Sequence, residues 1–229
     1  IFSATGQSYE QEAVIEGSGT SINSIAYEDL DRDGFTELVV GWRVSTDLLA
    51  LSVYSLKDGE PVELLRTNYV RYAVTDLDSD QYEELVVFRT DDEGSGVADY
   101  YGWQDGNLVP KASARISMTM AELSQVKNGA LKDGIPALFV SGVEESTNVI
   151  TDILAVRNGE LTNIVLSDVT GVSGEIAPFR MLYPTDINAD GLTEVPQPVD
   201  VPAWNDGEAV PSQQIDWRSY DIDGTATTV

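Results

Sequence analysis

Short apolar runs, separated by acidic loops and glycine turns, recur along this chain and predict β-strands throughout. The first cycle has extended segments at 22–27, 37–43, 49–56 and 61–66, and the turn Asp58-Gly59 joins the last two. Asp-Gly between alternating apolar runs is a strong hairpin signal, because the turn needs positive φ angles. A second cycle repeats these parts from Tyr69, and its turn Asp105-Gly106 comes 47 residues after the first.

Two further cycles are less regular. The third keeps strands at 135–140, 151–156 and 161–166 around the turn Asn158-Gly159. The fourth begins near Phe179 and contains several prolines between 196 and 211. Because proline cannot donate to a β-ladder, this insertion cannot be a central strand, and we expect an exposed loop that carries Trp204. Strands should resume at 214–220 and 225–229, whereas a single strand at 12–16 precedes all the cycles.

A period of roughly 47 to 57 residues with four short strands is typical of β-propeller blades. An open β-sandwich also has short strands and turns, but it gives no reason for the loop and the turn to recur in the same order. The lone first strand and the short last strand indicate part of a larger propeller, unless residues 12–16 pair with the last blade. We therefore expect an all-β, β-propeller-like fold. An N-terminal segment at 1–20 should contain one strand, and a repeat domain should follow at 21–229. The repeat domain should consist of four four-stranded antiparallel blades, at about 21–67, 69–115, 117–168 and 176–229.

Acidic residues occupy the same places in a nine-residue frame that precedes an apolar strand. Alternating carboxylates on a tight turn repel one another, but they can converge on one hard cation such as calcium. The residue at position 7 would add its backbone carbonyl, which is that of Phe35 in the first frame. The frame occurs as Asp29, Asp31, Asp33 and Glu37, as Asp76, Asp78, Asp80 and Glu84, and as Asp186, Asn188, Asp190 and Glu194.

An EF-hand also begins with acids at positions 1, 3 and 5, but it needs a glutamate at position 12 and flanking helices. Position 12 is Val40, Val87 or Gln197 here, and the flanks predict strands. The corresponding loop of the third cycle, 125–132, contains Lys127 and Lys132 and no acid, so we expect a blade without a metal site there.

The acidic motif, followed by a Leu/Val strand, resembles the FG-GAP and VCBS class of propeller repeats, which is known from integrin α-subunits and bacterial surface proteins. The motif covers three of the four cycles. The resemblance implies that each loop joins the first and second strands of a blade and binds calcium through the residues named above.

Two of the loops depart from the motif. Gln81 replaces the loop glycine, so a positive φ becomes costly there, and Asn188 removes one charge from the third site. For all three loops the alternative is an Asx-rich turn whose carboxylates cap backbone N–H groups without metal.

The net charge of −26 indicates a surface that repels nucleic acid and anionic lipid. There is no cysteine, no histidine and no apolar run near the ~20 residues that span a bilayer, so we expect no disulfides, no membrane insertion and no histidine-based catalysis.

These features favour a non-catalytic, extracytoplasmic, calcium-stabilised binding or adhesion module of a bacterial surface or secreted protein. Its partner would be an extracellular protein or a carbohydrate, with Trp204 as a ligand contact. The alternatives are a propeller enzyme that acts on carbohydrate through paired carboxylates, and a purely structural spacer.

Overall fold

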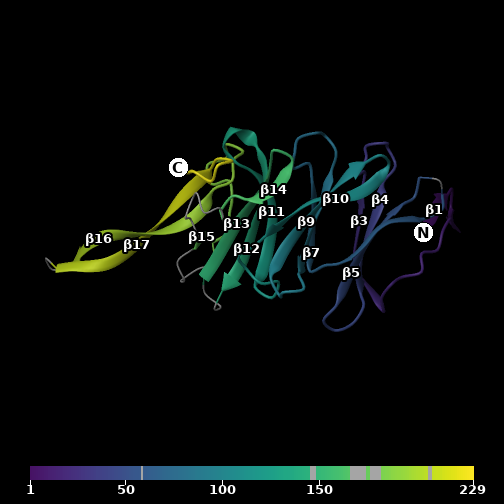
Figure 1. Ribbon diagram of the computed structural model, residues 1–229, viewed down its shortest axis with the longest axis horizontal. Coiled ribbons are helices and arrows are strands. Elements are labelled where there is room, and N and C mark those ends of the chain that lie inside the picture. The colour runs from purple at the N-terminus through teal and green to yellow at the C-terminus, as the bar shows by residue number, and fades with distance from the viewer. Residues whose placement is uncertain (58, 145–147, 166–173, 176–181, 206–207) are drawn as a thin grey trace. The chain divides into compact units, whose positions relative to one another are not determined.

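The structure is a computed structural model that describes residues 1–57, 59–144, 148–165, 174–175, 182–205 and 208–229 (Figure 1). Its described strands form five antiparallel sheets: a two-stranded N-terminal hairpin and four larger sheets in chain order, here called sheets 1 to 4. The all-β fold of antiparallel sheets is therefore confirmed, whereas a radial, propeller-like arrangement stays a prediction.

Sheets 1 and 2 are four-stranded meanders, and each lies within a predicted blade range or one residue beyond it. Their hairpin turns agree with the sequence signals, since Asp105 and Gly106 have φ angles of 51° and 79°. Sheet 1 contains β3 (Ser21–Glu28), β4 (Glu37–Arg43), β5 (Leu49–Ser55) and β6 (Val62–Asn68), and sheet 2 contains β7 (Arg71–Thr75), β8 (Glu84–Thr90), β9 (Gly96–Gln104) and β10 (Asn107–Arg115).

The N-terminal segment differs from the prediction. The strand expected at 12–16 is wrong, and a hairpin of β1 (Phe2–Thr5) and β2 (Ser8–Gln11) precedes that position. Gly6 has a φ of 67° in the turn between them. Glu12 instead donates its backbone N–H to the Ile1 carbonyl at 3.1 Å, which ends the hairpin and starts an irregular segment.

Sheet 3 has the order β11-β12-β13-β14, and β15 also pairs with β13. The loop predicted at 125–132 is wrong, because β11 runs through most of it and the connection is a short 3-10 turn that includes Asp133. Lys127 lies in β11, where its Nζ donates to the Pro184 carbonyl at 3.0 Å. The elements are β11 (Leu123–Ala130), η1 (Lys132–Gly134), β12 (Pro136–Glu144), β13 (Asn148–Arg157), β14 (Glu160–Asn163) and β15 (Gly174–Glu175).

Sheet 4 contains β16 (Val195–Asn205), β17 (Glu208–Tyr220) and β18 (Ala226–Thr228). The exposed loop predicted at 196–211 is wrong, since β16 and β17 lie side by side as one long hairpin (Figure 1). Residues 176–181, on which part of the predicted first strand of this blade falls, lie outside the described residues.

The spacing of the prolines explains why a strand is possible. Pro196, Pro198 and Pro202 are separated by even numbers of residues, so all three lack an N–H on the same edge of β16. Pro202 is paired with Pro211 across the hairpin, and two opposed prolines fit only a position without ladder hydrogen bonds. The missing donors therefore lie along the outer edge, where a strand tolerates proline.

The described chain divides into two compact units, residues 1–76, 80–89 and 99–111, and residues 77–79, 90–98 and 112–229. In the first unit, Val39, Leu51 and Val53 of sheet 1 pack against Leu85 and Val87 of sheet 2 in one buried cluster. In the second, Phe139 and Ile153 of sheet 3 pack against Val195 and Tyr220. None of the described helical segments is both long enough and apolar enough to cross a membrane.

Candidate metal loops

The three acidic loops connect paired strand positions in the same way. Asp29 follows β3, and Glu37 is the first residue of β4, opposite Glu28. Glu84 is likewise the first residue of β8, opposite Thr75. In the third loop, Glu194 forms an isolated antiparallel bridge with Thr185. Each loop is thus the turn of a β-hairpin or bridge. Glu37 and Glu84 are the first residues of the strands that follow, and Glu194 immediately precedes β16.

The backbone of the three loops has one conformation. Position 6 has a positive φ in each, 89° at Gly34, 77° at Gln81 and 88° at Gly191. The penalty expected for Gln81 therefore applies, because a side chain in this region is strained. Position 4 is also left-handed, which the sequence does not reveal, because Arg32, Ser79 and Ala189 share no chemical property that favours a positive φ.

Backbone hydrogen bonds hold the first aspartate by one oxygen in the first two loops and by both oxygens in the third, where Asp186 Oδ1 also accepts the Asp190 N–H at 3.2 Å. In each loop, Oδ2 of the first aspartate accepts the backbone N–H of position 6, at 3.2 Å in the first loop, 3.1 Å in the second and 2.9 Å in the third. The position 5 aspartate accepts the N–H of position 7 through Oδ1, at 2.8 Å in all three. These bonds are the contacts expected of an Asx-rich turn, in which carboxylates cap backbone N–H groups without metal.

Asx turns leave several carboxylate oxygens unexplained. Asp29 Oδ1, Asp76 Oδ1 and Glu194 Oε1 are buried and accept no hydrogen bond. Oxygens of Asp29, Asp31 and Asp33 lie within 4.8 Å of one another, and so do oxygens of Asp76, Asp78 and Glu84. Buried, unpartnered carboxylate oxygens are costly and rare, and oxygen atoms alone are the ligands that calcium prefers. The donor sets of the first two loops therefore fit a hard cation, and the third loop offers the unpartnered Glu194 Oε1.

Glu37 connects the first loop to the core. It is 2% exposed, and its Oε2 accepts the Leu30 backbone N–H at 3.0 Å. Burial raises the pKa of Glu37; the bond from Leu30 opposes this, while the negative charges of the loop aspartates raise the pKa further. The Phe35 side chain is exposed and its N–H donates to Asp33, whereas the predicted ligand role of its carbonyl stays a prediction.

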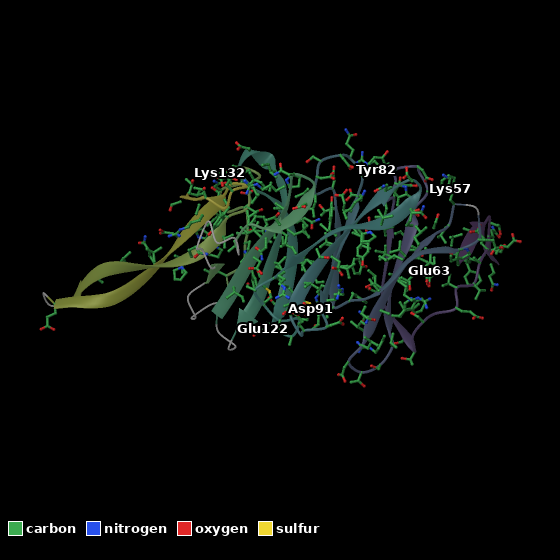
Figure 2. The ribbon with its side chains drawn as sticks, in the orientation of Figure 1. Lys57, Glu63, Tyr82, Asp91, Glu122 and Lys132 are labelled. Atoms are coloured by element: carbon green, nitrogen blue, oxygen red, sulfur yellow. The ribbon has the colours of Figure 1, made fainter. Side chains whose placement is uncertain are left out.

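Lys57 contacts the first acidic loop, and the sequence does not predict this contact. Its Nζ lies 2.6 Å from Asp33 Oδ2, and Figure 2 labels the residue. The hydrogen bond from Lys57 is the main reason why the pKa of Asp33 is below its usual value. No sequence signal identifies this contact, because Lys57 lies 24 residues after Asp33, in the turn that follows β5. An ion bound through Asp33 Oδ2 would have to compete with this ammonium group for the same oxygen.

The third loop contains an amide where the first two have an acid. Asn188 donates its Nδ2 to Asp190 Oδ2 at 3.0 Å, and its Oδ1 accepts the Asp190 backbone N–H at 3.0 Å. Its glutamate, Glu194, is fully buried and accepts the Ile187 N–H through Oε2 at 3.0 Å. Fewer charges are available here, but Glu194 Oε1 has no hydrogen-bond partner.

Trp204, the predicted ligand contact, lies in β16 and is paired with Ala209 of β17. It is therefore on a strand rather than on a loop, close to the end of the long hairpin. The structure does not describe its side chain, so its role as a contact stays a prediction.

No protein-family model matches this chain, and no curated protein matches it. Among solved structures it is similar to the exotype rhamnogalacturonan lyase YesX, with a TM-score of 0.53 and 16% identity over 90% of this chain and 40% of that chain. It is also similar to the rhamnogalacturonan lyase YesW, with a TM-score of 0.52 and 15% identity over 90% of this chain and 42% of that one. This chain thus spans about two fifths of the length of these enzymes, and at such identity the likeness concerns the fold alone.

Proposed function

We propose that this chain is a non-catalytic, calcium-stabilised binding module that acts outside the cytoplasm. One observation carries the proposal: three loops of the same backbone conformation each contain a buried carboxylate oxygen without a hydrogen-bond partner, at Asp29, Asp76 and Glu194. Such an oxygen is costly unless a partner lies beside it, and a cation held by the neighbouring loop carboxylates would be that partner. Extracellular modules commonly bind calcium at ~10⁻⁴ to 10⁻³ M, which is the range of external calcium.

The net charge adds a second reason. A chain with 39 acidic and 13 basic residues opposes its own compaction, and three divalent ions would reduce the net charge from −26 to about −20, with the added positive charge placed where carboxylates cluster. The role proposed for calcium is thus to stabilise the turns that precede β4, β8 and β16, and binding of a protein or carbohydrate partner would take place elsewhere on the sheets.

Thermal denaturation in EDTA and in millimolar calcium, at fixed ionic strength, tests this proposal. Calcium should raise the melting temperature of the unaltered chain, and magnesium should do so poorly because it demands a smaller, octahedral site. Asp31→Ala should remove much of the rise, and Asp78→Ala should remove less, because Gln81 strains the second loop. Asp47→Ala is the matched control, since it deletes an exposed carboxylate outside the three loops. A melting temperature that is the same with and without calcium would refute the proposal.

The second candidate is a carbohydrate-active protein, favoured by the fold likeness to two rhamnogalacturonan lyases. Two buried acids outside the loops have structural partners: Asp152 accepts hydrogen bonds from the Ser117 N–H and hydroxyl, and Asp99 pairs with Arg89. These contacts give both acids a structural role. Incubation with rhamnogalacturonan, followed by ultraviolet absorbance of an unsaturated product, separates catalysis from binding, because elimination creates a conjugated double bond and binding does not.

A further inference from the structure

Sheet 1 has two apolar faces, which cross-strand pairing defines. One, the Val39 face, consists of Val39, Leu51 and Val53, and it packs against sheet 2. The other, the Leu38 face, consists of Ile22, Ile25 and Tyr27 of β3, which are paired with Trp42, Val40 and Leu38 of β4. Residues paired across a ladder lie on the same side of a sheet, so these six side chains form one surface.

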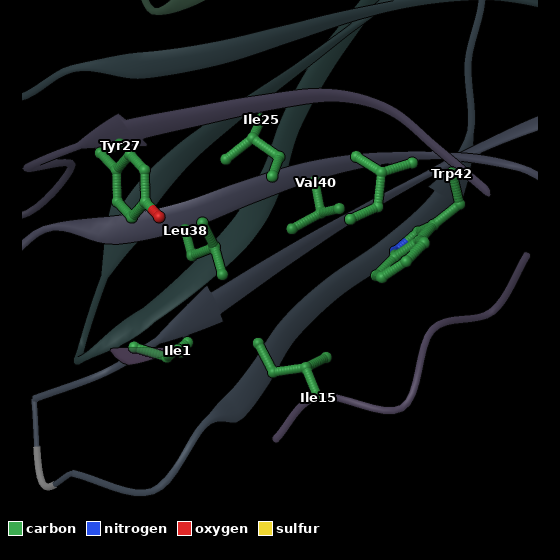
Figure 3. A pocket seen from close by; sticks show the side chains of 8 residues that line it. Ile1, Ile15, Ile25, Tyr27, Leu38, Val40 and Trp42 are labelled. Carbon is green, nitrogen blue, oxygen red and sulfur yellow. The ribbon is translucent and has the colours of Figure 1, made fainter. Parts of the chain in front are cut away.

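Part of the Leu38 face is exposed. Ile22, Ile25 and Tyr27 are 53%, 50% and 60% exposed. Ile1 and Ile15 of the N-terminal segment cover another part, and between them and the sheet there is a pocket of about 220 Å³ (Figure 3). Three large apolar side chains in one row, next to an apolar pocket, indicate an interaction surface rather than a solvated face.

The face of sheet 2 that corresponds to the Leu38 face has a packing partner within the chain. Leu85, Val87 and Tyr101 occur 47 residues after Leu38, Val40 and Tyr54, and all three are buried against the Val39 face of sheet 1. Tyr72 and Val74, which correspond to Ile25 and Tyr27, pack against the same cluster. The surface exposed in sheet 1 is therefore the one that, in sheet 2, packs on the preceding sheet.

Sheets 3 and 4 use the same arrangement. Val195 follows the glutamate of the third acidic loop, as Leu38 and Leu85 follow those of the first and second. It packs against Phe139 and Ile153, which are paired with each other in sheet 3 as Val39 and Val53 are in sheet 1. Two interfaces are thus described. In each, the residue directly after the loop glutamate, Leu85 or Val195, packs on the face of the preceding sheet that contains Val39 or its counterpart Phe139; we call this a Val39-type face.

We infer that the Leu38 face of sheet 1 is a docking surface for a further antiparallel sheet of the same repeat class, which presents a Val39-type face. A second copy of this chain fits poorly, because the residues at the corresponding position of its four sheets, Val39, Val86, Phe139 and Pro196, are all buried already. Its net charge of −26 would also repel the first copy. The inference does not depend on calcium binding.

A single cysteine tests this surface cleanly, because the chain has no cysteine of its own. Ile25→Cys in the full chain should react rapidly with a thiol reagent, and Val62→Cys, which is similarly exposed on β6, is the matched control. The probe for docking is a chain in which residues 21–67, one full period, are duplicated in tandem, so that the new sheet precedes the original one. Cysteine at the second copy of Ile25 should then react at least tenfold more slowly, and cysteine at the second copy of Val62 should react as before.

Three results would overturn the inference. Equal reactivity of the Ile25→Cys thiol in the parent and duplicated chains would show that the added sheet does not cover the face. Failure of the duplicated chain to fold, under conditions where the parent folds, would show that the two faces are incompatible. Slow labelling of Ile25→Cys in the parent chain would show that the N-terminal segment or a second copy already covers the face, and light scattering over a range of concentrations would identify the second copy.

Discussion

Glu194 provides the sharpest test of a cation in the third loop. Its side chain is fully buried; Oε2 accepts the Ile187 N–H at 3.0 Å, and Oε1 accepts nothing. Glu194→Gln keeps an oxygen for the Ile187 bond and replaces the charged, unpartnered oxygen with a neutral amide. The two states of the loop therefore respond to the substitution in opposite directions.

Without calcium the variant should be more stable than the unaltered chain. A buried, unpartnered polar atom costs on the order of 1 to 3 kcal/mol, and the new amide recovers part of this, so the free energy of unfolding should rise by about 1 kcal/mol. With calcium a hundredfold above its Kd, a site that binds only the folded chain adds about 2.7 kcal/mol, and loss of the buried charge should remove most of that gain. The order of stability should then reverse.

Urea denaturation of both chains in EDTA and in millimolar calcium measures this reversal. Glu60→Gln is the control, since it makes the same chemical change at an exposed position outside the loops. If Glu194→Gln is less stable than the unaltered chain in EDTA as well as in calcium, the buried oxygen is not costly in the metal-free chain and the argument from Glu194 is refuted.

Three further substitutions test single contacts. Gln81→Gly should raise the melting temperature in EDTA, because it relieves a left-handed residue whose strain costs about 1 kcal/mol or more; an unchanged value would contradict the strain. Lys57→Met should raise the calcium affinity of the first loop severalfold in titration calorimetry, since the ammonium no longer competes for Asp33, and an unchanged affinity would exclude competition. Burial raises the pKa of Asp152 above its usual value of about 3.9, so the unaltered chain should lose stability relative to Asp152→Asn as pH rises from there through the raised pKa. Urea denaturation at a series of pH values checks the sign, and a difference that is constant with pH would contradict it.

The sequence predicted the regular parts of the fold because local and tertiary signals agree there. Turns such as Asp105-Gly106 and Asn158-Gly159 adopt the positive φ angles that their residues favour. The runs that follow the acidic loops are buried on both faces of their sheets, as in Leu85, Val86 and Val87. The candidate ligands could be predicted from spacing alone, because all of them belong to three short loops.

The sequence fails to predict those parts of the fold in which a tertiary contact or a strand edge decides the structure. The hairpin of β1 and β2 carries almost no apolar periodicity, since every residue of β2 is exposed. In β16, the prolines suggested a loop because their common edge becomes visible only with the register of the hairpin. The contact of Lys57 with Asp33 depends on the folding of β4 and β5 between them, which spacing cannot reveal.

A cation in the first loop would act on the core as well as on the turn. Glu37 holds the Leu30 N–H through one carboxylate oxygen, and the Leu30 side chain is fully buried in the cluster between sheets 1 and 2. Leu38, the residue after Glu37, lies on the face of sheet 1 that points away from this cluster. An ion bound to this glutamate would therefore fix the start of β4 and the position of Leu30 at once. Because interiors are close-packed, a change in either position must be accommodated by the neighbouring sheet. The effect of calcium on stability should thus belong to the cooperative unfolding of sheets 1 and 2, not to local ordering of the loop.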